Sequence, residues 1–242
     1  LARLYPTLGD TDLWLVALSG VGMLTMFVGA TLALRQRDLK GMLAYATVSW
    51  LGALVLMLGL PHHEGYVAAM LGILAHALYK SPLFMVAGAI DHHAGTRIID
   101  RLGGLARAMP GAVIIAIICC LSMAGVIPLL GFAGKEALLH AIDHLHAPAQ
   151  PLLMIGVCIS AIFTVTVGAI FVWDVFFRKP TPVPATAKGG AHAGAHGHSD
   201  AHAHGDPHGD THGHDEHHAA PYMLLGPGII AAVSVILALL LE

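Results

Sequence analysis

The chain has few charged residues for its length. Asp, Glu, Lys and Arg make up 11% of the 242 residues, whereas apolar residues make up 56% and mean hydropathy is +0.73. Ordinary soluble domains carry about 25% charged residues, so this composition argues against a soluble enzyme. The 12 Lys and Arg do not outnumber the 15 Asp and Glu. A nucleic-acid-binding protein, which needs a basic surface, is excluded by that balance.

Cysteine is scarce as well. Cys119, Cys120 and Cys158 lie in apolar stretches, where a free cysteine behaves as a small hydrophobic residue. The sequence contains no C-x-x-C motif and too few cysteines for a disulfide framework. We find no catalytic centre and no dinucleotide-binding fingerprint either. We therefore expect no cofactor in this chain and leave open whether it belongs to a larger enzyme.

In place of charge the chain has six long apolar segments. A helix needs about 20 apolar residues to cross a bilayer, and none of the segments shows the two-residue alternation of a membrane strand. The predicted fold is all-α, a polytopic transmembrane helix bundle of about six spans. The segments cover residues 13–34, 42–60, 66–90, 111–130 (with a continuation to 142 left open), 152–177 and 222–241.

The basic residues support this map and predict an orientation. If the first span enters from outside, the inner loops hold nine Lys and Arg, and the outer loops hold only Arg3. Such a bias is typical of cytoplasmic loops, so we expect the N-terminal end to lie outside. The nine are Arg35, Arg37, Lys40, Arg97, Arg101, Arg107, Arg178, Lys179 and Lys188.

Histidine is concentrated in one stretch, since ten of the 18 lie within residues 188–218. This stretch has almost nothing apolar to bury, so 179–219 is predicted to be a disordered cytoplasmic loop. It would separate a five-span core at 1–178 from one further span at 220–242. A plain linker is the simpler interpretation, but histidine-rich loops also bind metal ions. The candidate ligands are His196, His198, His212 and His214.

Two ionisable residues lie inside the third apolar segment. His76 and Lys80 are four residues apart and share one helix face. A charge inside the membrane costs roughly 2.5–3.5 kcal/mol on insertion scales, which makes such residues functional candidates. Pro82 can kink the helix and open room for water. We predict that His76 and Lys80 pass a proton. The alternative is a lysine that reaches the lipid headgroups.

A second group of residues predicts a broken helix in the fourth segment. Pro128, Gly131 and Gly134 should interrupt a helix, which a membrane protein tolerates where the break is buried or lines a cavity. Lys135 and Glu136 follow directly, so a titratable pair lies at the break. The alternative is a helix that simply ends there, with an ordinary ion pair at the surface.

Polar residues continue beyond this break. Glu136, His140 and His144 recur in steps of four, with Asp143 beside them. One interpretation is a proton relay from Lys135 to the outer face. Another is a metal site, because histidines at i and i+4 can chelate, and a third is a polar stripe on a helix that nears water. All three stay open at the level of the sequence.

The start of the second segment carries a polar stripe of its own. Tyr45 and Ser49 are four apart, a spacing that suits hydrogen bonds between helices. Asp38 is well placed at a helix N-terminus, and Lys40 follows it. We interpret Lys40, Tyr45 and Ser49 as polar support and mainly as packing.

Three ordered blocks carry a resemblance. They are Gln36-Arg-Asp-Leu-Lys40 continued to Ser49, His76-Ala-Leu-Tyr-Lys80-Ser-Pro, and Pro128-Leu-Leu-Gly131-Phe-Ala-Gly-Lys135-Glu136. In order and spacing they resemble the family of proton-conducting antiporter-like membrane proteins, which includes the A subunit of Mrp-type Na⁺/H⁺ antiporters and the L subunit of complex I. The resemblance covers about residues 1–177. Asp91-His-His-Ala-Gly95-Thr-Arg97 is more similar to the Mrp lineage.

The resemblance implies roles for some of these residues. His76 and Lys80 would belong to a central polar chain, and Lys135 to an exit route with Glu136 beside it. It also implies other membrane subunits as partners and a bacterial plasma membrane as location. Two positions depart from the family pattern, with Gly72 where a histidine is frequent and Trp50 where glutamine is frequent.

The predicted function is proton translocation coupled to monovalent cation antiport, with Na⁺ as the leading candidate. The alternatives are a proton-pumping subunit of a complex I-type oxidoreductase or hydrogenase, a divalent-metal transporter suggested by the histidine-rich loop, and a structural scaffold. The chain opens at Leu1 without Met and stops directly after an apolar run. We therefore expect a piece of a longer protein, not a complete pump.

Overall fold

The computed structural model describes residues 1–9, 11–61, 63–145, 147–179 and 221–241, and their regular secondary structure is helical. The predicted histidine-rich loop and its four candidate metal ligands, His196, His198, His212 and His214, lie outside the described residues. The elements are α1 (Tyr5–Leu8), α2 (Asp12–Arg35), α3 (Leu39–Gly59), α4 (His63–Ala94), η1 (Ile99–Arg101), α5 (Pro110–Ala124), α6 (Leu130–Asp143), α7 (Gln150–Val172), η2 (Trp173–Phe177), η4 (Pro221–Leu224) and α8 (Leu225–Leu241).

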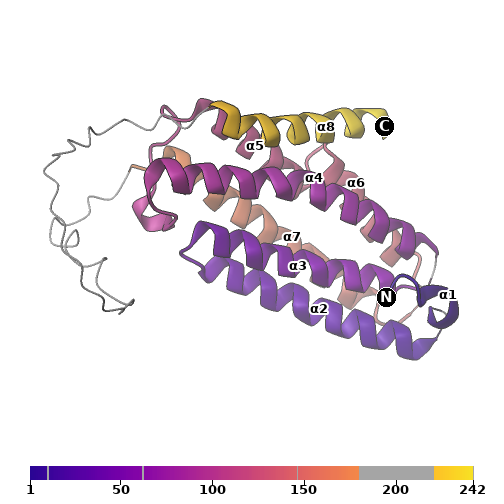
Figure 1. Ribbon diagram of the computed structural model, residues 1–242. Helices are drawn as coiled ribbons and strands as arrows, with labels where there is room; N and C mark the ends of the chain where they lie inside the picture. Colours follow the sequence, from indigo (N-terminus) through magenta and orange to yellow (C-terminus); the bar gives the residue numbers. More distant parts are fainter. Residues whose placement is uncertain (10, 62, 146, 180–220, 242) are drawn as a thin grey trace, which may run out of the picture.

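All six predicted apolar segments coincide with helices, which confirms the all-α membrane fold. α2, α3, α4 and the continuous α7–η2 helix are long and apolar enough to cross a membrane. α5 and α8 are shorter apolar helices. The fourth segment is the broken one, since it divides into α5 and α6. Figure 1 shows the helices lying side by side in a bundle, with α2 and α3 as an antiparallel hairpin.

Small residues let α2 and α3 approach each other closely. A Cβ atom at Gly52 would lie 2.5 Å from the backbone nitrogen of Met26, and one at Gly29 would lie 2.5 Å from that of Ser49. The Ser49 hydroxyl donates a hydrogen bond to the Met26 carbonyl over 2.8 Å. This is the small-residue, hydrogen-bonded packing that membrane helices use, and Ser49 serves it directly.

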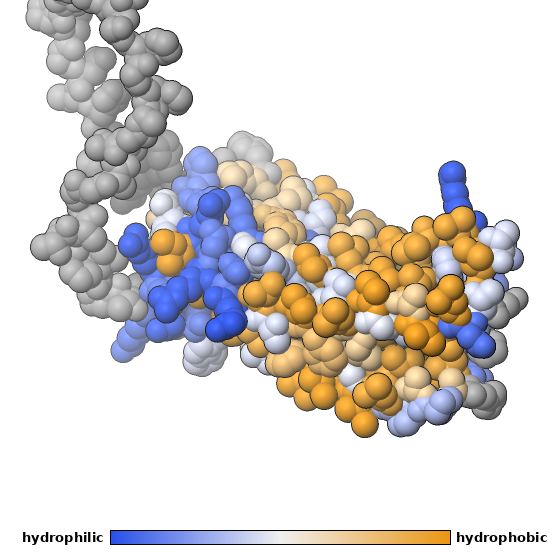
Figure 2. Space-filling view, turned by 90° about the horizontal axis from the view of Figure 1, so that it is seen from below, coloured by the Kyte–Doolittle hydropathy of each residue, from blue (hydrophilic) through white to orange (hydrophobic). Residues whose placement is uncertain are grey.

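The surface has the pattern of a membrane protein. On the face shown in Figure 2, apolar side chains cover the middle of the molecule and hydrophilic residues gather at its ends, mostly at one of them. Large apolar side chains point outward on several helices, including Leu13, Val16, Leu152, Ile162 and Leu240. α2, α4 and η2 all end at the end of the bundle where most of the hydrophilic residues gather (Figures 1 and 2). Which side of the membrane this end faces stays a prediction.

Candidate functional site

His76 and Lys80 lie on α4 one turn apart, with Lys80 buried inside the bundle and His76 half-buried. The His76 ring stacks against Trp50 of α3, with centroids 5.9 Å apart and planes 5° apart. Its Nδ1 atom lies 3.0 Å from the Tyr79 hydroxyl, which is a hydrogen bond. α4 continues through Pro82 without a helix break, so this proline does not divide the span.

Lys80 is a buried lysine with no carboxylate partner in the part of the chain that the structure describes. The residue is 4% exposed, and the Sδ atom of Met123 lies 3.9 Å from its Nζ atom. Among the described residues, no Asp or Glu forms an ion pair with it. The headgroup-reaching alternative is therefore not what the structure shows. Burying an unpaired ammonium group is costly, which marks Lys80 as a functional candidate.

The break between α5 and α6 is built by a different glycine than the sequence suggested. α5 ends at Ala124, and Gly125 follows with a φ of 85°, a left-handed conformation that favours glycine. Pro128 lies between α5 and α6, as predicted, whereas Gly131 and Gly134 lie inside α6, so the prediction that these two glycines interrupt the helix is wrong. They allow close packing instead: a Cβ atom at Gly131 would overlap the Ser122 carbonyl oxygen of α5.

Lys135 closes this break. Its Nζ atom donates to the carbonyl oxygens of Met123 and Ala124, over 2.8 and 2.9 Å. These carbonyls belong to the last turn of α5, where helices leave acceptors unsatisfied and where positive charge is favoured. A lysine at the C-terminal end of a half-helix is thus held by backbone dipoles. It makes no ion pair with Glu136, which is exposed.

One cavity joins the three candidate residues. It has a volume of about 80 Å³ and is lined by His76 and Lys80 from α4 and by Lys135 from α6. A cavity of this size has room for a few water molecules, and its mainly apolar wall carries a few polar groups that could bind them. The sequence placed these residues on separate segments, and the structure brings them to one space. Hydroxyl side chains from two further helices also line it, namely Ser49, Ser160 and Thr164.

A separate groove shares Lys135 with this cavity. It is lined by Lys135, Glu136, His140 and Asp143 along α6, and it has a volume of about 550 Å³. Lys135 lines both spaces. Lys135 therefore lies between the cavity of His76 and Lys80 and the groove that follows α6 to its exposed end.

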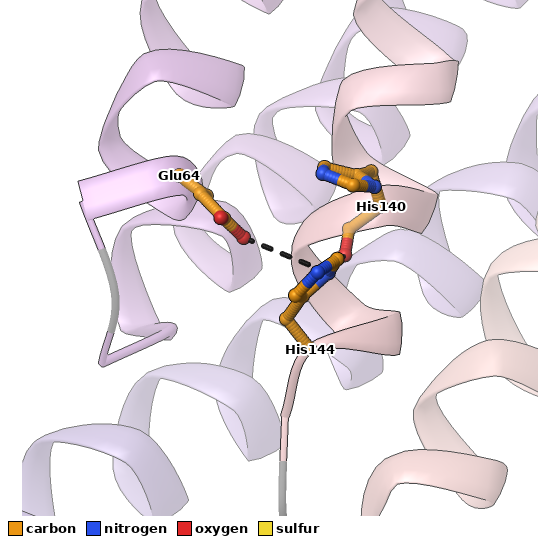
Figure 3. Close-up of side chains that lie close together, drawn as sticks. All are labelled: Glu64, His140 and His144. Atoms are coloured by element: carbon orange, nitrogen blue, oxygen red, sulfur yellow. Dashed lines mark hydrogen bonds and ion pairs between the residues drawn. The ribbon is translucent and has the colours of Figure 1, made fainter.

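At that exposed end, α6 meets the start of α4 (Figure 3). His144 Nδ1 lies 3.0 Å from the His140 carbonyl oxygen and 3.8 Å from Glu64 Oε2. The two histidine rings have centroids 4.3 Å apart. Sequence reasoning found both histidines but missed Glu64, because it comes from another helix 76 residues before His140 in the chain.

The two positions that depart from the family pattern contact each other. The Trp50 indole nitrogen donates to the Gly72 carbonyl oxygen over 3.3 Å. Gly72 in turn packs against Gly134 of α6, whose Cβ position would lie 3.5 Å from the Gly72 Cα atom. The two departures are thus structurally linked beside His76.

The remaining polar candidates lie at the hydrophilic end. Lys40 pairs with Asp91 over 2.8 Å, and this joins the start of α3 to the end of α4. Asp38 caps α3 by accepting from Gly41 N and forms an ion pair with Arg97. Tyr45 packs against the apolar core. These residues support the architecture and do not reach the cavity, whereas Ser49 does.

Comparison with known proteins identifies the family. The family model described as "NADH:quinone oxidoreductase/Mrp antiporter, TM" matches residues 1–164. The chain is 41% identical over 182 residues to the probable A/B subunit of a K(+)/H(+) antiporter of Rhizobium meliloti, which covers 74% of the chain and 18% of that protein. It is 37% identical over 201 residues to the A1 subunit of a Na(+)/H(+) antiporter of Staphylococcus haemolyticus. This match covers 75% of the chain and 25% of that protein.

Two solved structures are similar in fold. One is the Mrp complex from Dietzia sp., with a TM-score of 0.67, 40% identity and coverage of 71% of this chain and 19% of the other. The second is an archaeal membrane-bound sulfane sulfur reductase, with a TM-score of 0.69 and 26% identity. The match covers 92% of this chain and 32% of the reductase chain. This chain thus spans a third or less of the length of each of these proteins. It is an integral multi-pass membrane protein and belongs to the NADH:quinone oxidoreductase/Mrp antiporter transmembrane family.

Proposed function

We propose that this chain forms part of the proton route in the A subunit of a multisubunit Mrp-type antiporter of the bacterial plasma membrane. The observation that carries the proposal is the shared cavity of His76, Lys80 and Lys135. Titratable groups that meet at one cavity inside a membrane protein are typical elements of a proton relay. Other membrane subunits would be the partners of the full-length protein.

The lysines would act by exchanging protons. Lys135 donates two hydrogen bonds to α5 carbonyls, and a neutral amine still has two N–H donors and gains a lone pair. The position therefore suits both protonation states. Two ammonium groups at one cavity repel each other, so a proton that arrives at Lys80 favours release from Lys135. His140, in the groove beyond Lys135, is the next residue towards solvent.

The coupled ion is proposed to be Na⁺. Relatives similar to this chain are named as Na⁺/H⁺ and as K⁺/H⁺ antiporter subunits. Antiport assays with the full-length protein in membrane vesicles, with Na⁺ or K⁺ as the only added cation, separate the two. Activity with K⁺ alone would reject the Na⁺ assignment and keep the proton route.

A second candidate is a proton-pumping subunit of a respiratory complex of the complex I or hydrogenase type. It is favoured by the archaeal reductase, whose fold matches 92% of this chain. Purification of the full-length protein with its partners distinguishes the two. Co-purified redox subunits would favour this second candidate.

Replacing Lys80 tests the proton route itself. In the full-length protein, Lys80→Ala should reduce cation-dependent proton transport by roughly 10²-fold, the scale of a lost proton-transfer group. Lys40→Ala is the matched control, since this lysine lies in an ion pair outside the cavity. Full transport in Lys80→Ala, with normal assembly, would remove Lys80 from the route.

A further inference from the structure

The residues that meet at the exposed ends of α4 and α6 have the composition of a metal site. Glu64, His140 and His144 each offer one ligand atom, and these atoms all lie within 4.8 Å of one another (Figure 3). Two imidazoles and one carboxylate, with all three side chains open to solvent, are the donor set of a three-ligand zinc site completed by water. We propose that this cluster binds Zn²⁺.

Helix packing fixes the positions of the three ligands. α4 and α6 run antiparallel, and Gly134 packs against Gly72. At 1.5 Å per residue, Glu64 lies about 12 Å from Gly72 along α4, while His140 and His144 lie about 9 and 15 Å from Gly134 along α6. The register set by the two glycines therefore brings Glu64 level with the histidines. The site is a product of the fold, since its residues come from helices far apart in sequence.

The side chains need only small adjustments to coordinate a metal ion. Zinc bonds to nitrogen and oxygen of about 2.0–2.2 Å in a tetrahedral site place the ligand atoms about 3.3 Å apart. Rotation of exposed side chains brings the three atoms from within 4.8 Å to that spacing. The His144 atom that lies 3.8 Å from Glu64 Oε2 is Nδ1, and Nδ1 also donates to the His140 carbonyl, which can only accept. Coordination through Nδ1 would replace this hydrogen bond, and coordination through Nε2 would need the exposed ring to turn.

Bound Zn²⁺ would also affect the groove that begins at Lys135. His140 lines this groove, so a bound dication there would place positive charge beside the route and oppose the passage of protons. Zinc would therefore slow transport. This consequence rests on the proposed function, whereas the metal site itself does not.

The test is zinc binding by the full-length protein, measured by competition with a chromogenic chelator. A background variant that lacks residues 189–218 removes the histidine-rich stretch, which would compete for the metal. In this background, His140→Ala, His144→Ala and Glu64→Gln should each weaken binding at one site by at least roughly tenfold. His63→Ala is the matched control, since this histidine lies beside Glu64 but outside the cluster. It should leave binding unchanged.

X-ray absorption of the bound zinc gives a second readout, which does not depend on how well a variant folds. Two imidazole nitrogens with oxygen ligands are expected. Unchanged affinity in His140→Ala and His144→Ala, or a zinc with only oxygen or sulfur ligands, would overturn the site.

Transport with and without added Zn²⁺ tests the consequence separately. Zinc should inhibit the background protein, and His144→Ala should lose that inhibition. Zinc that binds at the cluster without slowing transport would support the site and overturn its effect on the route. If the background protein showed no transport even without zinc, the result would count against the proposed function and not against the zinc site.

Discussion

Two lysines of this chain illustrate how differently one residue type is used at the end of the bundle and inside it. Lys40 lies at the hydrophilic end, where Asp91 pairs with it over 2.8 Å. Lys80 is 4% exposed, and Met123 Sδ is 3.9 Å from its Nζ atom. Lys40 links α3 to α4 through this ion pair. The buried one lines a cavity with His76 and Lys135 and has no carboxylate among the described residues to satisfy it.

The largest effect that sharpens this comparison is expected at Lys135. Lys135→Met keeps the length of the side chain but removes the amine that holds the last α5 carbonyls. Because the amine both closes the break and lines the cavity, we expect proton transport to fall by roughly 10²-fold. Transport by reconstituted full-length protein measures it, with Lys40→Met as the control. Equal losses in the two variants would contradict the distinction drawn between these lysines.

A smaller effect is expected from the contact that positions Lys135. Gly131→Val forces a side chain into the Ser122 carbonyl of α5, so α6 must shift. Overpacking of this kind destabilises by about 1–3 kcal/mol. A lower melting temperature of the purified protein would report it. Gly88→Ala is the control, because nothing lies within 4 Å of a Cβ atom there and alanine has the higher helix propensity, so no loss of stability is expected.

The smallest effect is expected at the hydrophilic end. Asp38→Ala removes both the cap on Gly41 N and the ion pair with Arg97, which should cost about 1–2 kcal/mol. Asp38→Asn keeps a capping oxygen and loses only the exposed ion pair with Arg97, so a loss of stability of about 0–1 kcal/mol is expected. Melting temperatures of the two variants separate the contributions. A larger loss in Asn than in Ala would show that the cap is not what stabilises α3.

The apolar runs predicted the helices because a run of about 20 apolar residues has the length and composition of a membrane-spanning helix. The scarcity of charge in these runs drew attention to Lys80 and Lys135. The partner of Lys40 could not be read from the sequence, because Asp91 lies 51 residues away and only packing brings it close. Glu64 was missed for the same reason. Of the residues expected to break the helix, Pro128 lies between α5 and α6, but Gly131 and Gly134 lie inside α6. Gly125, directly after the α5 run, was the available signal for the end of α5.

The most direct test of the central claim is proton transport by full-length Lys80→Arg. Arginine keeps the positive charge at the cavity but does not give up its proton in proteins. If Lys80 acts by exchanging a proton, transport should be lost although the protein assembles. Lys40→Arg, which keeps the ion pair with Asp91, should remain active in the same assay. Transport near the wild-type rate in Lys80→Arg would show that the charge alone suffices and would contradict the account.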